Sequence, residues 1–142
     1  MKKIHNYLNG KSFSISKKDL PVEDPSKGEV IAKVVLSSVD DFEKILESSK
    51  HSQKEWANTT PLKRSRILSK YKTLIEKNID ELAEIVSIEH GKTLDDAKGS
   101  VTRGLEVVEF ACGIPHVLKG EFSQNVGTNI DSWSIRQPLG IC

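Results

Sequence analysis

Short apolar runs alternate with turn-forming residues over residues 1–36, a pattern typical of antiparallel strands. Asn9 and Gly10 lie between two apolar stretches, and an Asn-Gly pair accepts the positive φ angles of a two-residue hairpin turn. A second turn-rich stretch at 24–29 precedes the apolar run 30–35. We therefore expect a β-ribbon of hairpins over the first 36 residues.

The next two patterns have helical spacing. We expect the first helix to begin at Ser38, because Ser38 and Asp41 have the spacing of a capping box. We expect the second to begin at Thr60-Pro61, since threonine caps helices and proline suits the first helical position. The apolar residues that recur on one face are Phe42, Ile45, Leu46 and Trp56 in the first helix, and Ile67, Leu68, Tyr71, Leu74 and Ile75 in the second.

Two further helices are predicted before the chain reaches Gly113. The third is expected to end at Gly91, because glycine readily takes the left-handed conformation that closes many helices. The fourth is expected to begin at Thr93 and to reach about Cys112. Their apolar faces carry Ile79, Leu82, Ala83 and Val86, and then Ala97, Val101, Leu105 and Val108.

Residues 128–137 alternate loosely and predict a last strand, centred on Trp133. Helices separate this strand from the ribbon of residues 1–36, so a sheet joining them would come from further chain or from a partner subunit. The sequence closes on the mostly apolar residues 138–142, whereas chain ends usually lie in exposed polar segments. We therefore expect a longer protein, of which this is a part.

Composition narrows the classes of function. The chain has 21 basic and 20 acidic residues, and this balance argues against binding to nucleic acid or to an anionic membrane. No apolar run approaches the roughly 20 residues that cross a bilayer, and residues 1–10 lack the apolar centre of a signal peptide. Two cysteines provide no disulfide framework. A cytoplasmic protein is expected, with a thin core because only 6% of residues are aromatic.

Several possible chemical sites are disfavoured by their spacing. The run Gly91-Lys92-Thr93 resembles the end of a phosphate-binding loop, but the upstream glycine is replaced by Val86. Glu106 and Glu109 are three residues apart, a spacing more typical of solvated acids than of acid–base catalysis. The histidines, which lack the spacing of metal ligands, are His5, His51, His90 and His116. We expect no metal site.

Four segments together resemble the aldehyde dehydrogenase superfamily from its N-terminus inward. They are 7–11 (YLNGK), 23–31 (EDPSKGEVI), the region from Trp56 to Leu68 with Pro61 and Arg64, and 89–93 (EHGKT). The second segment departs from the usual family motif at Asp24, Ser26 and Lys27. The resemblance follows the order of the family motifs along the chain.

Three later segments resemble the methylmalonate-semialdehyde dehydrogenase branch of that superfamily: 103–116, 118–123 and 130–140. The resemblance implies an α/β fold of the aldehyde dehydrogenase type, of which this chain would be the N-terminal part. The divisions it implies are N-terminal hairpins at 1–36, a helical segment of the NAD-binding domain at 37–120, an oligomerisation strand region at 121–138, and the start of the first Rossmann strand at 139–142.

The resemblance also implies an activity. In this branch a cysteine thiolate attacks the semialdehyde, hydride passes to NAD, and coenzyme A takes the acyl group. The carboxylate is lost as bicarbonate, and the implied products are propionyl-CoA and acetyl-CoA, in the breakdown of valine and myo-inositol. The nucleophilic cysteine is expected beyond residue 142, so neither Cys112 nor Cys142 is a candidate, and Cys112 is expected to be a structural thiol. No cofactor-binding residue is assigned.

Arg103 is the one candidate for substrate binding. The resemblance implies that its guanidinium holds the carboxylate of the semialdehyde, and a planar fork of donors suits a carboxylate. A solvated helix residue is the alternative. The family usually has glutamate where Ser100 stands, so an ion pair made there is expected to be missing.

The remaining alternatives concern the molecules that this chain binds. The chain is expected to join a homo-oligomer, a tetramer, through residues 128–137, because an exposed edge strand is protected when it pairs. It could instead be a stand-alone binding module or a split-gene piece that associates with a dehydrogenase subunit. A nucleic-acid binder using Lys17, Lys18 and the basic residues of 63–66 is disfavoured by the net charge of +1.

Overall fold

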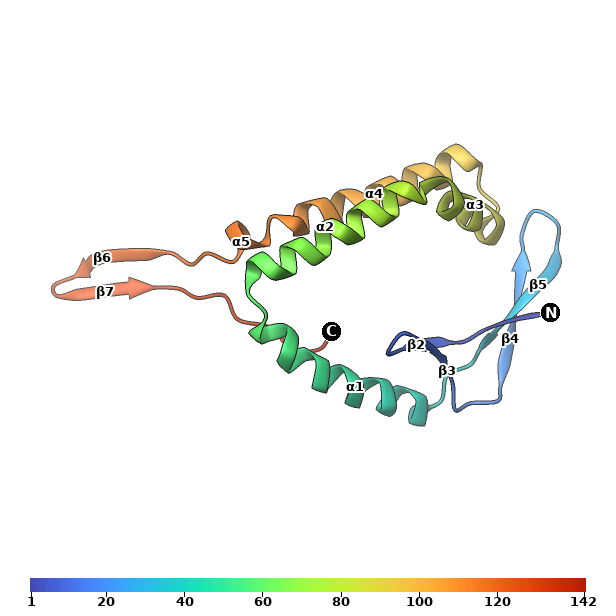
Figure 1. Cartoon of the computed structure of the whole chain (residues 1–142), viewed down its shortest axis with the longest axis horizontal. Coiled ribbons are helices and arrows are strands. Elements are labelled where there is room, and N and C mark those ends of the chain that lie inside the picture. Colours follow the sequence, from blue (N-terminus) through green and yellow to red (C-terminus); the bar gives the residue numbers. More distant parts are fainter.

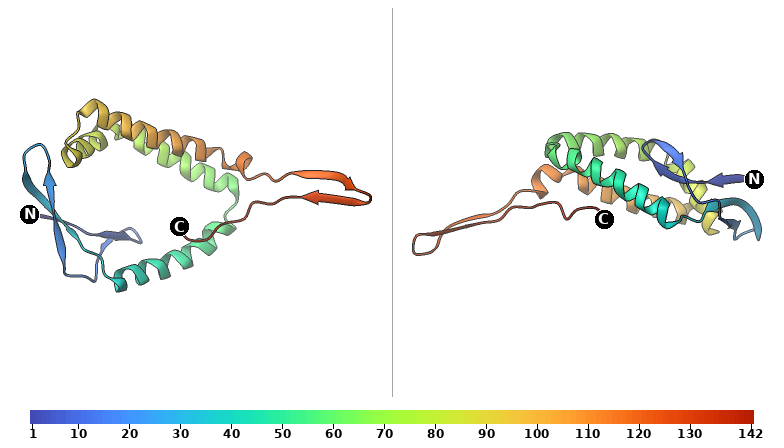
Figure 2. Two further views of the ribbon diagram at one scale, coloured as in Figure 1. Left: turned by 180° about the vertical axis from the view of Figure 1, so that it is seen from behind. Right: turned by 90° about the horizontal axis from the view of Figure 1, so that it is seen from below.

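Figure 1 shows the computed structural model, which describes residues 1–142. The strands of the N-terminal region lie at one end, helices occupy the middle, and a two-stranded arm projects from the opposite end. Helix α1 (Val39–Asn58) leads away from the strands, and α2 (Pro61–Lys77) returns toward them. Figure 2 shows from two further directions that the arm extends beyond the helices.

The N-terminal strands form two small sheets. Strand β5 (Glu29–Val35) lies at the centre of a three-stranded sheet, between the parallel β1 (Lys2–Ile4) and the antiparallel β4 (Asp19–Asp24). Strands β2 (Asn6–Leu8) and β3 (Lys11–Phe13) form the other sheet. Both predicted hairpins are confirmed, while β1 was not predicted.

The turn between β2 and β3 has the geometry that its sequence predicts. The φ angles of Asn9 and Gly10 are 52° and 77°, so both turn residues lie in the left-handed region that a type I′ turn requires. Leu8 therefore pairs directly with Lys11.

The helix boundaries follow the predicted caps. The Ser38 hydroxyl accepts a hydrogen bond from the Asp41 backbone N–H, and the Asp41 carboxylate accepts one from the Ser38 backbone N–H, which completes the capping box of α1. Thr60 caps α2. Helix α3 (Ile79–His90) ends at Gly91 with φ 71°, and Thr93 caps α4 (Leu94–Cys112). The four predicted helices are thus confirmed, and a short α5 (Ile114–Val117) follows Gly113.

Helix α4 packs along α2 and against α3, and the three form one layer (Figure 1). Ala83 of α3 and Ala97 of α4 are fully buried, because small side chains let two packed helices approach closely. Lys72 of α2 lies 3.1 Å from a carboxylate oxygen of Glu109 on α4. Helix α1 stands apart from this layer (Figures 1 and 2).

Asp41 joins α1 to the strands. Its carboxylate is fully buried and accepts hydrogen bonds from the backbone N–H groups of Ile15 and Ser16, at 2.5 and 3.1 Å. It also accepts one from the Ser38 backbone N–H at 2.8 Å. One carboxylate therefore fixes the segment after β3 and the start of α1 in place together.

The predicted strand at 128–137 is wrong in its extent. The structure has an antiparallel arm made of β6 (Phe122–Gly127) and β7 (Ile130–Trp133), with a turn at Thr128-Asn129. Residues 134–142 have no regular secondary structure. The arm strands pair only with each other, so no sheet joins them to the N-terminal strands.

Candidate functional site

Arg103 lies on α4, and its side chain is exposed. Its Nη2 donates a hydrogen bond to Ser100 Oγ at 3.0 Å, one helical turn earlier. A Cβ placed on Gly99 would lie 3.7 Å from Nη1, so the guanidinium rests beside that glycine. No carboxylate of the chain forms an ion pair with Arg103.

Lys92 meets Arg103 at the same hydroxyl. Lys92 Nζ donates to Ser100 Oγ at 2.8 Å and lies 3.1 Å from Asp96 Oδ2. The Ser100 hydroxyl itself donates to the Asp96 backbone carbonyl at 3.2 Å. The structure thus brings together two cations, one hydroxyl and one carboxylate along the first half of α4 and the loop before it, and position 100 takes part in no ion pair.

The loop from α3 to α4 positions Lys92. Gly91 takes the left-handed conformation that ends α3, and Ser87 Oγ donates to the Lys92 backbone carbonyl at 2.7 Å. The Thr93 hydroxyl caps α4 by accepting from the Asp96 backbone N–H at 3.3 Å. Each residue of the Gly-Lys-Thr run is therefore occupied in a helix connection. These residues do not fit a cradle for the phosphates of a dinucleotide.

The two glutamates of α4, Glu106 and Glu109, have different contacts. Glu109 pairs with Lys72, whose pKa is raised above its usual value by Glu76 first and by Glu109 second. Glu106 is exposed and forms no ion pair. Their arrangement supports packing of α2 against α4, with no acid–base pair between them.

The cysteines lie away from Arg103. Cys112 is half-buried at the end of α4, and its backbone carbonyl accepts a hydrogen bond from the Ser65 hydroxyl at 2.6 Å. Cys142 is exposed near the end of the chain. No group of three or more His, Cys, Asp or Glu side chains gathers where it could hold a metal ion. None of the helices is long and apolar enough to cross a membrane.

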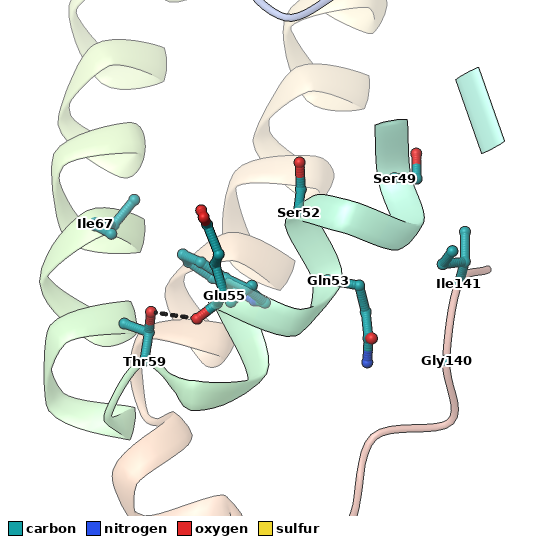
Figure 3. Close-up of a pocket in the computed structure, with 9 residues that line it drawn as sticks. Ser49, Ser52, Gln53, Glu55, Thr59, Ile67, Gly140 and Ile141 are labelled. Carbon is teal, nitrogen blue, oxygen red and sulfur yellow. Dashed lines mark hydrogen bonds between the residues drawn. The ribbon is translucent and has the colours of Figure 1, made fainter. Parts of the chain in front are cut away.

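A hollow of about 570 Å³ lies between the end of α1, the start of α2 and the chain end, as Figure 3 shows. Trp56, Ile67 and Ile141 provide its apolar lining, and Thr59 Oγ1 donates to the Glu55 carbonyl at 3.0 Å beside it. Arg103 is not among its lining residues. No lysine or arginine lines the hollow, whereas two cations meet at Ser100, so the group around Ser100 is the candidate site for an anionic substrate.

Sequence reasoning found Arg103 through a family resemblance but missed Lys92. Lys92 lies in the loop before α4, so helical spacing gave no signal of its approach to Ser100. Within α4, Asp96, Ser100 and Arg103 follow one another at intervals of four and three residues and lie on one face of the helix.

A family model described as "Aldehyde dehydrogenase family" matches residues 13–142. Malonate-semialdehyde dehydrogenase of Pseudomonas aeruginosa is 42% identical over 138 residues, which cover 97% of this chain and 28% of that protein. The acylating methylmalonate-semialdehyde dehydrogenase of Arabidopsis thaliana, a mitochondrial protein, is 42% identical over 142 residues and is covered to 23%.

Solved structures give the same result. A Sinorhizobium meliloti protein described as a methylmalonate-semialdehyde dehydrogenase, in complex with NAD, superposes with a TM-score of 0.92 at 45% identity. The match covers 99% of this chain and 29% of that one. Methylmalonate-semialdehyde dehydrogenase from Oceanimonas doudoroffii superposes with a TM-score of 0.91 at 40% identity, covering 98% and 28%. The chain therefore spans less than a third of the length of these relatives.

Proposed function

Because this chain belongs to the aldehyde dehydrogenase family, we propose that it forms the N-terminal part of an NAD-dependent, CoA-acylating (methyl)malonate-semialdehyde dehydrogenase. The observation that carries the proposal is 42–45% identity, over nearly the whole chain, to proteins described as malonate- and methylmalonate-semialdehyde dehydrogenases. The substrates proposed are malonate and methylmalonate semialdehyde, which are oxidised by NAD and transferred to coenzyme A, with loss of the carboxylate as bicarbonate, to give acetyl-CoA and propionyl-CoA.

This chain contributes Arg103 to the proposed reaction. A semialdehyde of this class carries a carboxylate beside the reacting carbonyl, and an arginine that forms no ion pair in the chain can hold that carboxylate with two parallel hydrogen bonds. Fixing the carboxylate orients the aldehyde carbon toward the nucleophile. NAD accepts the hydride when bound. None of the residues described above is assigned to the NAD site, which we place in other parts of the enzyme.

Replacing Arg103 with leucine in the intact dehydrogenase is expected to raise KM for malonate semialdehyde roughly 10- to 150-fold, since hydrogen bonds to charged groups contribute about 1.5–3 kcal/mol. The KM for propanal, which has no carboxylate, is expected to stay within about 2-fold. Steady-state kinetics with both aldehydes measure the difference. Arg103→Lys is the matched control, because it keeps the charge and loses the planar fork. Equal effects on both aldehydes would show that Arg103 does not bind the carboxylate.

The arm and the helices have proposed places in the whole enzyme. We assign residues 37–120 to the NAD-binding domain and 121–138 to an oligomerisation region that pairs across subunits in a tetramer. Exposed apolar side chains on the arm support this assignment, since Phe122 and Trp133 are 65% and 67% exposed. We further propose that the whole enzyme is cytoplasmic and acts in the breakdown of valine and myo-inositol.

The second candidate function is a binding module that associates with a separately encoded dehydrogenase subunit. The exposed apolar faces of α1 and α2 support it as well, because such faces bind other protein. The two candidates differ in what the chain needs: further residues of its own polypeptide, or a second polypeptide.

The isolated 142-residue chain is expected to show no NAD-dependent oxidation of malonate semialdehyde, because no residue of the chain is placed as nucleophile or dinucleotide ligand. The measurement follows NADH formation with NAD and coenzyme A present, and the intact dehydrogenase is the positive control. Turnover by the chain alone that is lost in the Cys112→Ala variant would show that the nucleophile lies within this chain, and would overturn the proposal.

A further inference from the structure

We propose that Arg64 anchors this chain to the remainder of the dehydrogenase, by pairing through its terminal Nη groups with a carboxylate of the residues that follow Cys142. This anchor rests on the proposed function in one respect, namely that the chain is the N-terminal part of a longer polypeptide. The surroundings of the Arg64 guanidinium carry it.

Arg64 lies near the start of α2, and its side chain is half-buried. Its Nε is closed to solvent and has no hydrogen-bond acceptor within residues 1–142. The two Nη groups remain accessible, since Nε is the one buried side-chain nitrogen or oxygen that lacks a partner. No carboxylate of the chain pairs with Arg64. A partly desolvated guanidinium is costly to leave unpaired, so Arg64 calls for an acceptor from outside these residues.

The hollow beside Arg64 determines where such an acceptor lies. It measures about 420 Å³, and residues 136–140 of the last segment line it together with Arg64 and the end of α1. It adjoins the hollow of Figure 3, with which it shares Gln53, Trp56 and Gly140. The accessible end of Arg64 therefore meets a space that is bounded by the last residues of the chain.

The lining of this hollow is positively charged. Arg64 and Arg136 are its two charged residues, and neither forms an ion pair within the chain. A guanidinium binds a carboxylate with two parallel hydrogen bonds, which satisfies its donors and its charge together. A neutral carbonyl would satisfy a donor and leave the charge, and this costs more once water is excluded. The lining therefore favours an occupant that carries a carboxylate.

The occupant that we assign is the polypeptide beyond Cys142. The chain spans 28–29% of the length of its relatives, so most of the proposed enzyme lies beyond it. Cys142 itself lines the hollow, and the next residues of the polypeptide start from this wall. They reach Arg64 before a second subunit can, and they also cover Trp56, which is 42% exposed. The semialdehyde is a poorer occupant, because Arg103 does not line this hollow.

The first test is a crystal structure of the intact dehydrogenase with its natural sequence. A carboxylate oxygen of a residue beyond 142, in the same polypeptide, is expected at about 3 Å from an Arg64 Nη. The proposal would be overturned if Arg64 contacted only solvent, backbone carbonyls, residues 1–142 or an acid of another subunit. This measurement needs no variant, so it stands even where a substitution prevents folding.

The second test compares thermal unfolding midpoints of variants of the intact enzyme. Arg64→Met keeps the unbranched stem and removes the charge, and it is expected to lower the midpoint by about 5 °C or more. Arg64→Lys should lose less, since it keeps the charge without the planar fork. Arg66→Met is the matched control, because Arg66 is exposed on the same helix, and it should shift the midpoint by about 1 °C or less. Equal midpoints for Arg64→Met and Arg66→Met would contradict the anchor.

Hydrogen exchange of the intact enzyme, followed by mass spectrometry, locates the loss. Arg64→Met is expected to raise deuterium uptake about 2-fold in the peptides directly after Cys142 and to leave the arm, residues 122–133, unchanged. Arg136→Met, which changes an exposed residue outside the helices, should give a smaller rise in the same peptides. A rise confined to α2 would mean that Arg64 stabilises only its own helix, and would overturn the proposal.

The anchor and the proposed function fail separately. An intact enzyme that oxidises malonate semialdehyde with NAD and coenzyme A, but whose Arg64 meets no carboxylate beyond residue 142, would overturn the anchor alone. An intact enzyme in which Arg64 pairs as expected, but which does not oxidise malonate semialdehyde, would support the anchor and overturn the proposed function.

Discussion

Replacing Asp41 with alanine is expected to lower the thermal unfolding midpoint of this chain by roughly 10 °C. The Asp41 carboxylate is fully buried and accepts hydrogen bonds from three backbone N–H groups, those of Ile15, Ser16 and Ser38. Alanine leaves all three part-buried donors without this acceptor, and removing the acceptor of a buried hydrogen bond is costly. Circular dichroism on heating measures the change.

Asp40 provides the control for this substitution. It is the neighbouring acid in the first turn of α1, it is exposed, and it accepts none of these hydrogen bonds. Asp40→Ala is expected to shift the midpoint by only about 1–2 °C, through the loss of a favourable charge at the helix start. Equal midpoints for the two variants would mean that Asp41 does not join α1 to the strands.

The same carboxylate gives the folded chain an acid limit. Hydrogen bonds from the backbone of Ile15 and then of Ser38 lower the Asp41 pKa from 3.8 to about 2. Because the folded pKa lies below the unfolded one, the stabilisation is complete above about pH 4 and is lost as the pH falls toward 2. Asp41→Asn should remove this part of the acid dependence, which pH titrations of the unfolding midpoint in both proteins would detect.

Replacing Gly120 with alanine is expected to separate the base of the arm. A Cβ on Gly120 would clash with the backbone carbonyl oxygen of Ser134, and no side-chain rotation relieves a clash with backbone. At this point the Ser134 N–H donates to the Glu121 carbonyl at 2.9 Å, and the Glu121 N–H donates to Ser134 Oγ at 3.0 Å. An isolated two-stranded arm is only marginally stable. A steric clash that costs about 1–3 kcal/mol is therefore enough to unpair its strands.

Cross-strand NMR contacts between Phe122 and Trp133, which pair directly, measure this loss. Gly104→Ala is the control, since nothing lies within 4 Å of a Cβ at that position and alanine favours the helix interior. We expect the control to keep the cross-strand contacts. If Gly120→Ala keeps them too, the close approach of Gly120 and Ser134 is not needed for the arm. In the proposed tetramer the same substitution should weaken subunit assembly.

The sequence predicted local structure well because local structure depends on near neighbours. The capping box of Ser38 and Asp41 spans three residues, and the left-handed Gly91 needs only its own freedom to take a positive φ. The Ile15 donor to Asp41 lies 26 residues away, and β1 pairs with β5 across about 30 residues of chain. No periodicity reports such pairings, so these contacts required the structure.

The error at 128–137 has a similar origin. Alternation continues past Trp133, but a strand ends where its partner ends, and Phe122 at the start of β6 lies opposite Trp133. Strand β6 was missed because Asn125 interrupts it with a φ of 56° and its register shifts between Ser123 and Gly127. Alternation identified one side of the arm and overestimated its length.

The candidate site was predictable in part. Arg103 followed from a family resemblance, and Ser100 was singled out because it replaces an acid. The role of Lys92 was not predicted, because the Gly-Lys-Thr run was considered only for phosphate binding, which Val86 disfavours, and as one of the family segments. Its approach to Ser100 depends on the bend between α3 and α4, which Gly91 and the Ser87 hydrogen bond determine.

The Asp41 joint also bears on the order in which the chain folds during synthesis. Its donors and acceptor lie within residues 15–41, and the sheet attached to it is complete at Val35. These residues are synthesised before α2, and none of the contacts of the joint needs α2, so the N-terminal unit can close early. The arm, made last, pairs only with itself. No strand of this chain waits for a partner more than about 30 residues away, which limits the time during which a nascent edge is open to aggregation.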